Sequence, residues 1–450
     1  MLNIIRTLAN KRFAILPQRL VHGAAVMRNY HFLLDSQYWS AEQLAAFQLR
    51  ALQRLITHAY HQSTFYRVRF EQIGLEPGDV KSFQDMRQIP YLTKQDLRDN
   101  FETIKVRDFA RHHPILTRTG GTTGAPVTLY RSRNTAEMRQ AIEWRNYHWA
   151  GQDYRQRKMS LFPGTSRDIG KEPYFEDPRH RMLVVKTFQL DPERLRLFHH
   201  LYHRYRPSFL MGIVEFYRVL GRFLEREGLD DIKSPALFVQ GEAVTPIDRE
   251  RFCRWFGARV YDYYGMRENA VSASECTEGT MHINQEFVFQ EFENDRRPAL
   301  PGEPAEIIGT SLHNFAMPLI RCRTGDIGQL ESAPCACSRT HQAMRITGGR
   351  TRDFISTPTR LIYICHHMSY LLDLSDGVEA LQFYQPDRGT VVIRVVRNSN
   401  YTREDTDKLT NALARLTGGE LRIEIEFVED IPRTRVGKYR FVVSDIDPTL

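Results

Sequence analysis

The sequence predicts an α/β protein: a large N-terminal α/β domain with a helical N-terminal region, followed by a small, mobile C-terminal α+β domain. Three observations predict this fold class. Apolar residues recur at helical spacing over residues 1–110, and short apolar runs alternate with helical patterns from about residue 115 to 330. The C-terminal residues return to strand patterns around one capped helix. We therefore place the large domain at 1–349 and the small domain at 350–450.

Capping signals mark two helices of the N-terminal region. Ser40-Ala-Glu-Gln43 has the pattern of a capping box, and Thr93-Lys-Gln-Asp96 begins a helix by the same logic. After the first of these caps, apolar residues follow at helical spacing, namely Leu44, Phe47, Ala51, Leu55 and Ala59. We interpret this region as scaffold.

The central part alternates strands and helices. Ala236–Gln240 and Arg259–Tyr261 are short apolar runs of the kind found in buried strands, and Asp248–Phe256 between them has a helical pattern. Open α/β sheets bind ligands beyond the carboxyl ends of their strands. Polar motifs that directly follow these strands are therefore candidate ligand contacts.

The C-terminal part has a different organisation. Val391–Val396 is strand-like, and Thr402 caps a helix that ends at Gly418-Gly419. Arg422–Phe427 alternates charged and apolar residues, which predicts a half-exposed strand. Glycines and charges cluster at 348–353, which marks the boundary between the two domains.

Composition excludes several functional classes. The 450 residues are 42% hydrophobic and 26% charged, and no run of about 18 apolar residues predicts a transmembrane helix. The net charge of +8 suits anionic ligands, but no nucleic-acid-binding pattern accompanies it, so we expect phosphate-bearing small molecules rather than nucleic acid. Six cysteines are too few for a disulfide framework, which favours the cytoplasm. Residues 1–12 predict a helix packed on its own domain or, alternatively, one that touches a membrane surface.

A Gly/Thr-rich loop, Thr117-Arg-Thr-Gly-Gly-Thr-Thr-Gly-Ala-Pro126, is the strongest single signal. It lies between the strand-like segments Ile115-Leu116 and Val127-Thr-Leu-Tyr130. Glycine lets the backbone approach a ligand closely, and successive N–H groups and threonine hydroxyls can surround an anion. The loop therefore suits a polyphosphate, although it lacks the Gly-Lys-Ser/Thr end of the Walker motif. A polar hairpin turn is the alternative.

Five weaker motifs follow in order along the chain. They are Gln240-Gly-Glu-Ala243, Asp262-Tyr-Tyr-Gly-Met-Arg-Glu268, Arg323-Thr-Gly-Asp326, Gly349-Arg350 and Ile431-Pro-Arg-Thr-Arg-Val-Gly-Lys-Tyr-Arg440. Together with the Gly/Thr loop, they resemble the adenylate-forming superfamily of acyl-CoA synthetases, and within it the phenylacetate–CoA ligase and CapK-like branch. N-terminal segments typical of that branch extend the resemblance to nearly the whole chain: Leu55-Ile-Thr-His-Ala-Tyr60, Phe65-Tyr-Arg67 and Ile89-Pro-Tyr-Leu-Thr-Lys94.

The resemblance implies a two-step reaction. A carboxylic acid, aromatic in parts of the family, attacks the α-phosphate of ATP; pyrophosphate leaves and an acyl-adenylate forms. The thiol of coenzyme A then attacks the adenylate carbonyl. The implied cofactors are ATP, Mg²⁺ and coenzyme A. Two alternatives stay open: transfer to an amine or a carrier-protein thiol in surface-polysaccharide or secondary-metabolite synthesis, or a non-catalytic nucleotide-binding relative. A homodimer is the default assembly.

The matching positions imply individual roles. The loop that grips the β- and γ-phosphates consists of Thr119, Gly120, Gly121, Thr122, Thr123 and Gly124. The adenine pocket is lined by Gly241, Glu242, Asp262, Tyr263, Tyr264 and Gly265, where a tyrosine face suits stacking on a purine. Asp326 accepts hydrogen bonds from the ribose hydroxyls, and Arg350 contacts ribose and phosphate at the domain junction.

Three residues are implied in catalysis: Lys438, Glu268 and Thr123. Lys438 matches the mobile lysine that bridges the substrate carboxylate and the α-phosphate, a role that suits a compact charge on a flexible stem. Glu268 matches the carboxylate that holds Mg²⁺, a cation that prefers oxygen ligands. The alternatives are an ordinary surface lysine, a helix-capping Glu268 and a turn-capping Asp326.

Two positions depart from the family pattern. Arg267 stands where the family usually has threonine; an arginine there can contact phosphate or a second anionic group, or it marks altered or lost activity. Glu215 lies in a segment near the acyl pocket, which normally has small residues. Glu215 facing the pocket would indicate an amine or hydroxyl on the substrate, and an outward orientation is the alternative.

Four residues predict a structural metal site, Cys276, His282, Cys335 and Cys337. Three thiolates and one imidazole are a ligand set that tetrahedral Zn²⁺ prefers, and some members of the branch look similar in holding a metal at such positions. The full set of four ligands leaves no open position, so the role is structural. The alternatives are four unrelated residues, or a rival cluster at Cys365-His366-His367, where core packing is the simpler interpretation.

Overall fold

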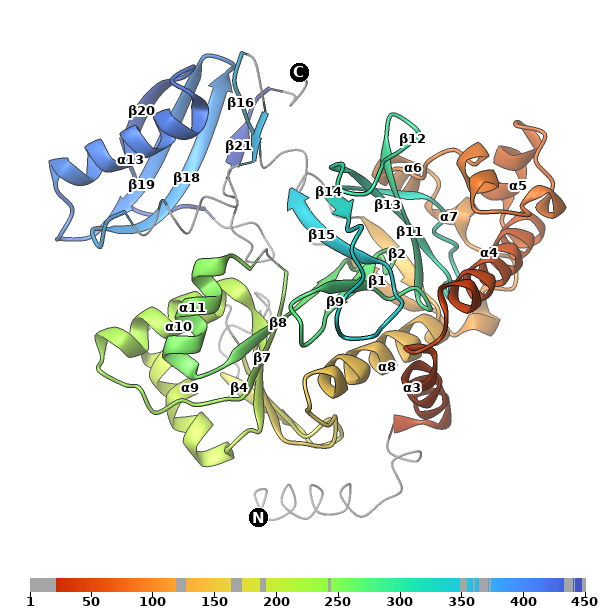
Figure 1. Cartoon of the computed structure of the whole chain (residues 1–450), viewed down its shortest axis with the longest axis horizontal. Coiled ribbons are helices and arrows are strands. Elements are labelled where there is room, and N and C mark those ends of the chain that lie inside the picture. The colour runs from red at the N-terminus through yellow and green to blue at the C-terminus, as the bar shows by residue number, and fades with distance from the viewer. Residues whose placement is uncertain are drawn as a thin grey trace.

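The structure is a computed structural model of the chain. It describes residues 22–118, 127–162, 172–186, 192–241, 244–348, 354–358, 361–363, 371, 374–432, 440 and 442–446. Figure 1 shows a large body of sheet and helices, with a smaller sheet and its helix α13 set off from it. In the part of the chain that is described, no helix is both long and apolar enough to cross a membrane.

The N-terminal region is helical, as predicted. Its elements are α3 (Ala24–Ser36), α4 (Ala41–Gln62), α5 (Thr64–Glu71), η1 (Pro77–Asp79), η2 (Gln84–Gln88), α6 (Lys94–Asp99), α7 (Phe101–Ile104) and η3 (Phe109–His112). Both predicted capping boxes form: the side chains of Ser40 and Thr93 accept from the backbone N–H groups of Gln43 and Asp96.

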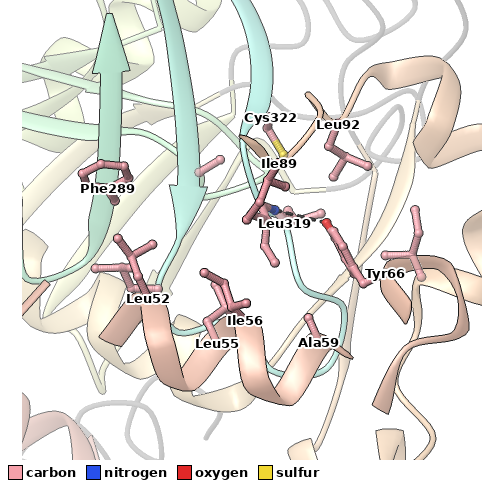
Figure 2. Close-up of a cluster of buried hydrophobic side chains, with 14 of the residues drawn as sticks. Leu52, Leu55, Ile56, Ala59, Tyr66, Ile89, Leu92, Phe289, Leu319 and Cys322 are labelled. Atoms are coloured by element: carbon pink, nitrogen blue, oxygen red, sulfur yellow. Dashed lines mark hydrogen bonds between the residues drawn. The ribbon is translucent and has the colours of Figure 1, made fainter. Parts of the chain in front are cut away.

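The apolar stripe of α4 packs this region onto the large sheet. Figure 2 shows Leu52, Leu55 and Ile56 facing Phe289 and Leu319 in a buried cluster. These residues repeat at helical spacing, so one face of α4 is apolar along its length.

A large mixed sheet forms the centre. Its parallel part comprises β3 (Lys158–Phe162), β5 (Met182–Lys186), β6 (Phe209–Ile213), β7 (Ala236–Gln240) and β8 (Arg259–Gly265), with β4 (Tyr174–Asp177) antiparallel at the edge. The helices of this part are α8 (Arg133–Trp149), α9 (Pro192–Tyr205), α10 (Val214–Arg226) and α11 (Pro246–Phe256). The predicted strand–helix–strand at β7, α11 and β8 is confirmed.

Antiparallel strands continue the same sheet. They are β9 (Ser272–Glu275), β10 (Met281–Ile283), β11 (Val288–Asn294), β12 (Arg297–Pro298), β13 (Ala305–Ser311), β14 (Cys322–Leu330) and β15 (Ala343–Gly348). The strand order is β12-β11-β13-β14-β15-β10-β9-β8-β7-β6-β3-β5-β4. A separate hairpin pairs β1 (Ile115–Arg118) with β2 (Thr128–Arg131), so the strands that flank the Gly/Thr loop lie side by side.

The C-terminal unit has the α+β composition expected from the sequence. It contains β16 (Phe354–Ser356), β17 (Leu361–Tyr363), β18 (Val378–Asp387), β19 (Thr390–Arg397), α13 (Arg403–Thr417), β20 (Arg422–Phe427) and β21 (Val442–Ser444). Helix α13 ends at Gly418, whose φ of 65° is the left-handed conformation that glycine adopts easily. The predicted domain boundary lies outside the described residues, between the end of β15 and the start of β16.

A buried ion-pair network fastens the helical region to the sheet. Arg321 is 1% exposed and donates to Glu293 at 2.7 and 2.6 Å and to Glu291 at 3.0 Å. Its Nη1 also donates to the backbone carbonyl of Ile89 at 2.7 Å, and the Tyr91 hydroxyl donates to Glu293. The segment that contains Ile89 and Tyr91 is therefore held against β11 and β14 by paired charges, because a buried guanidinium needs every donor satisfied.

Candidate functional site

The end of β8 carries the residues predicted to line the adenine pocket. Gly265 closes the strand, and a Cβ atom there would lie 2.7 Å from Cε1 of Tyr263, so a larger residue would displace the Tyr263 ring from its place over the backbone. The Tyr263 hydroxyl lies 3.1 Å from Oγ of Ser272 on β9. At the end of β7, Gly241 has a φ of 95°, which also requires glycine.

Asp326 owes its position to an irregularity in β14. The register with β13 shifts between Glu306 and Ile308, which is a bulge of the kind that redirects a side chain. Gly325 lies at the bulge with a φ of 73° and donates to Glu306 at 3.2 Å. The Asp326 N–H donates to Oγ1 of Thr324 at 3.0 Å, so the Thr-Gly-Asp sequence is needed to build this turn of the strand.

The structure brings Tyr264 and Asp326 together. The Tyr264 hydroxyl donates to Oδ2 of Asp326 at 2.9 Å, and both side chains are half-buried. This contact joins the predicted adenine segment to the predicted ribose carboxylate. One aromatic ring and one carboxylate, joined in this way, can contact the base and the sugar of the same nucleotide.

Glu268 lies in a tight turn directly after β8. The Asn269 N–H donates to the carbonyl of Met266 at 3.0 Å, and Asn269 has a φ of 53°, a conformation that asparagine tolerates. Glu268 is 5% exposed. Burial raises the pKa of the Cys322 thiol, and the negative charge of Glu268 raises it further, which indicates that Glu268 lies near the start of β14.

Asp262 has a perturbed environment. Burial raises the pKa of its carboxyl group to about 7, and the negative charge of Glu275 adds to the effect. Glu275 makes a two-bond ion pair with Arg249, at 2.8 Å for each bond, and accepts from the Asp262 N–H at 2.9 Å. The Asp262 backbone is therefore fixed by a charged pair, while its own carboxyl group titrates near neutral pH.

Positive charge gathers near the same end of the fold. Burial lowers the pKa of the Arg131 guanidinium, and the nearby charges of Arg139 and Arg267 lower it further. Arg131 ends β2, Arg139 lies on α8, and Arg267 is exposed in the turn after β8. Three guanidinium groups from three elements produce a field that favours an anionic ligand.

Several predicted site residues lie outside the described part of the chain. They are Thr119, Gly120, Gly121, Thr122, Thr123, Gly124, Glu242, Arg350 and Lys438. The side chain of Glu215, residues 1–12 and the Cys365 cluster also lie outside it. The roles of these residues stay predictions.

The predicted metal ligands form a cluster. One ligand atom from each of Cys276, His282, Cys335 and Cys337 lies within 4.8 Å of the others. The Sγ atoms of Cys276 and Cys335 are 3.6 Å apart, and Sγ of Cys337 is 3.3 Å from Nε2 of His282. The residues come from the end of β9, from β10 and from the segment between β14 and β15, so the fold assembles the set from distant parts of the sequence.

The surroundings of the cluster suit metal ligation. Nδ1 of His282 lies 3.2 Å from the His341 carbonyl, so Nδ1 carries the proton and the Nε2 lone pair points toward the thiols. The Glu278 N–H donates to Sγ of Cys276 at 3.3 Å. These contacts are the outer-shell interactions that metal ligands usually make.

A buried charge network lies behind the cluster, and no motif in the sequence predicts it. Glu286 accepts from Arg145 at 2.7 Å, from Ser36 at 2.6 Å and from His341 at 2.9 Å. Although burial opposes the effect, Arg145 and His341 hold the pKa of Glu286 well below its usual range. The network fixes His341, whose carbonyl in turn orients His282.

The chain is similar to several known proteins. Residues 355–445 match the family described as the CapK C-terminal domain. Phenylacetate-coenzyme A ligase of Escherichia coli (strain K12) is 28% identical over 334 residues, 70% of this chain and 73% of that protein. Protein CapK of Staphylococcus aureus is 24% identical over 402 residues, 85% of each chain. The structure of 2-hydroxyisobutyryl-CoA ligase in the postadenylation state has a TM-score of 0.70 over 91% of this chain and 93% of that one, at 19% identity.

The fold is that of acyl-CoA ligases of known structure, and the predicted nucleotide motifs lie at the ends of β7 and β8 and within β14. The curated proteins that resemble this chain over most of its length are phenylacetate–CoA ligases and a CapK protein, so the chain is similar to that branch of the adenylate-forming ligases.

Proposed function

We propose that this protein is an ATP-dependent carboxylate ligase that forms an acyl-adenylate with release of pyrophosphate and then transfers the acyl group to coenzyme A. The hydrogen bond between Tyr264 and Asp326 carries the proposal, because it makes one site from two motifs that the sequence can only place in order. Glu268 lies buried in the turn after the same strand that carries Tyr264.

Each residue has a task in the first step. Asp326 accepts from the ribose hydroxyls while the Tyr264 hydroxyl fixes its carboxylate, so the sugar is held before the reaction begins. Glu268 would hold Mg²⁺, which neutralises phosphate charge when it is bound. Thr119 to Gly124 surround the β- and γ-phosphates, and Arg267, close to Arg131 and Arg139, adds positive charge on the phosphate side.

The second step needs the small domain to move. We place the hinge at residues 349–353, between β15 of the large sheet and β16 of the small unit. In one orientation Lys438 bridges the substrate carboxylate and the α-phosphate, and Arg350 contacts the nucleotide. In the other, Lys438 withdraws and the thiol gains access to the adenylate carbonyl. We place the enzyme in the cytoplasm, where its cysteines stay reduced.

We further propose that Cys276, His282, Cys335 and Cys337 hold a structural Zn²⁺. The convergence of their ligand atoms and the His282–His341 contact support this assignment. The metal would join β9 and β10 to the segment that precedes β15, and so would stabilise the part of the sheet between β8 and β14.

A second candidate function differs only in the acceptor. The chain is similar to a CapK protein as well as to coenzyme A ligases, and in this second version an amine or a carrier-protein thiol takes the acyl group in place of coenzyme A. Adenylation without any coenzyme A-dependent product would support this version.

ATP–pyrophosphate exchange, measured across a panel of aromatic, hydroxy and short-chain carboxylic acids, tests the proposal. We expect exchange that depends on one class of acid and falls strongly in Asp326→Ala. Thioester formation with coenzyme A then identifies the acceptor. Tight ATP binding without exchange for any acid would contradict the enzymatic function and support a non-catalytic relative.

A further inference from the structure

A second group of metal-binding side chains lies on the surface of the parallel half of the sheet. Nε2 of His199 lies 2.7 Å from Oδ1 of Asp231, and Nε2 of His203 lies 3.0 Å from Oδ2 of the same carboxylate. The two imidazole rings are 4.7 Å apart. One ligand atom from each of the three residues lies within 4.8 Å of the others.

Helix geometry and tertiary contacts together produce this convergence. His199 and His203 are four residues apart on α9, so their side chains lie on one face of the helix. Asp231 lies between α10 and β7, next to Ile232, which is 1% exposed. The Lys233 N–H donates to the Tyr202 hydroxyl at 3.2 Å, and that hydroxyl donates back to the Lys233 carbonyl. The segment that carries Asp231 is thus held against α9 by contacts outside the cluster.

We propose that His199, His203 and Asp231 bind a divalent transition-metal ion such as Zn²⁺, with water completing the coordination. Two imidazoles and a carboxylate are ligands that Zn²⁺ accepts, at about 2.0–2.2 Å from the ion. Because the two Nε2 atoms already point at one carboxylate, small side-chain rotations are enough to place an ion among them. The partial exposure of all three side chains gives the ion and its water access.

The bound ion would connect two elements beside the parallel part of the large sheet. It would tie α9 to the connection that enters β7, and β7 ends at Gln240 directly before Gly241 of the predicted adenine segment. Without an ion, the two imidazoles make only hydrogen bonds to the Asp231 carboxylate. Uptake of added metal therefore distinguishes a metal-binding site from an ordinary polar contact.

Zinc titration of the full-length protein tests the proposal. After dialysis against a mild chelator, retained zinc is measured, Zn²⁺ is added, and bound zinc and the thermal midpoint are followed. We expect one added equivalent and a higher midpoint for the wild type and for His200→Ala, which removes an exposed histidine of the same helix outside the cluster. The double variant His199→Ala/His203→Ala should lose both effects.

Two comparisons keep the test decisive. Without added zinc, the double variant should have the wild-type far-ultraviolet circular dichroism spectrum and the wild-type thermal midpoint. If it does not fold normally, the single variant His203→Ala replaces it in the titration. Cys337→Ser should lose retained zinc but keep the added equivalent, which separates this site from the cysteine cluster. The inference is wrong if the wild type takes up no added zinc, or if the double variant takes up as much as the wild type.

Discussion

The Tyr264 hydroxyl donates a 2.9 Å hydrogen bond to Asp326, although their strands, β8 and β14, are separated by β9, β10 and β15 in the sheet. Neighbouring strands lie about 4.8 Å apart, so four steps across a flat sheet would span about 19 Å. The hydrogen bond therefore requires the sheet to bend strongly between β8 and β14. This bend turns two separate motifs into one site.

Removal of the Tyr264 hydroxyl should lower the catalytic efficiency with ATP. In Tyr264→Phe the ring is kept, but Asp326 loses the donor that fixes its carboxylate. We expect kcat/KM for ATP to fall about tenfold, or about 1.4 kcal/mol, near the low end for a hydrogen bond to a charged group. Pyrophosphate exchange at varied ATP concentration measures the effect.

A matched control lies in the small domain. The Tyr384 hydroxyl donates to Asp445 at 2.6 Å, so Tyr384→Phe removes the same kind of hydrogen bond far from β8 in the fold. This control should leave kcat/KM for ATP unchanged. Equal effects of the two substitutions would show that the Tyr264 contact has no specific role in nucleotide binding.

Local signals explain why much of the fold was predictable. Helix ends depend on neighbouring residues. The predicted caps at Ser40 and Thr93 form, and so do α11 and the C-terminal helix α13, which Gly418 caps. The strand order of the sheet and its bend depend on pairings between distant segments, for which a single sequence has no local signal.

The candidate site shows the same division. The motifs that contain Tyr264 and Asp326 were identified, but their hydrogen bond was not, because strand alternation specifies only the face on which a side chain lies. The cysteine cluster was recognisable from ligand types, whereas the contact between His282 and the His341 carbonyl involves a backbone atom. The ion pair between Arg249 and Glu275 lacked any signal, since buried and exposed charges look alike in a sequence.

Lys438 should be needed for adenylation but not for folding. Its positive charge stabilises charge that develops between the carboxylate and the α-phosphate, so Lys438→Ala should lower the exchange rate at least about a hundredfold. The affinity for ATP and the thermal midpoint should stay close to wild type. Lys408→Ala is the control, because Lys408 makes an exposed ion pair with Glu404 on α13. Exchange by Lys438→Ala at the wild-type rate would contradict the assigned role.

The cysteine cluster should retain zinc through purification. Cys337→Ser removes one thiolate from the set of four, so we expect loss of the retained metal and a lower thermal midpoint. Metal analysis by mass spectrometry and thermal unfolding measure both quantities. Cys253→Ser changes an exposed cysteine outside the cluster and should preserve them. A wild-type protein purified without zinc, and unaffected by Cys337→Ser, would show that the four residues are not a metal site.

Asp262 should make stability depend on pH in a defined direction. Its pKa of about 7 in the folded protein exceeds the value of about 3.9 in an unfolded chain. Such a group stabilises the folded state fully below about pH 4, and the contribution is lost as the pH rises through 7. Asp262→Asn stays neutral at every pH. The thermal midpoint of this variant minus that of the wild type should therefore increase from pH 5 to pH 8. Asp407 is exposed, so Asp407→Asn is the control and should show no such increase. If the midpoint difference between Asp262→Asn and the wild type is the same at pH 5 and pH 8, the pKa of Asp262 is not raised.

Arg321 should contribute more to stability than any exposed arginine of the fold. Arg321→Met leaves Glu291 and Glu293 without their buried partner and frees the carbonyl of Ile89, so the helical region loses its attachment to β11 and β14. Removal of one member of a buried ion pair costs about 3–5 kcal/mol of unfolding free energy. Arg345→Ala breaks an exposed pair with Glu331 and should cost only about 0–1 kcal/mol. Urea unfolding measures both losses, and equal values would mean that the buried network does not hold these two parts of the protein together.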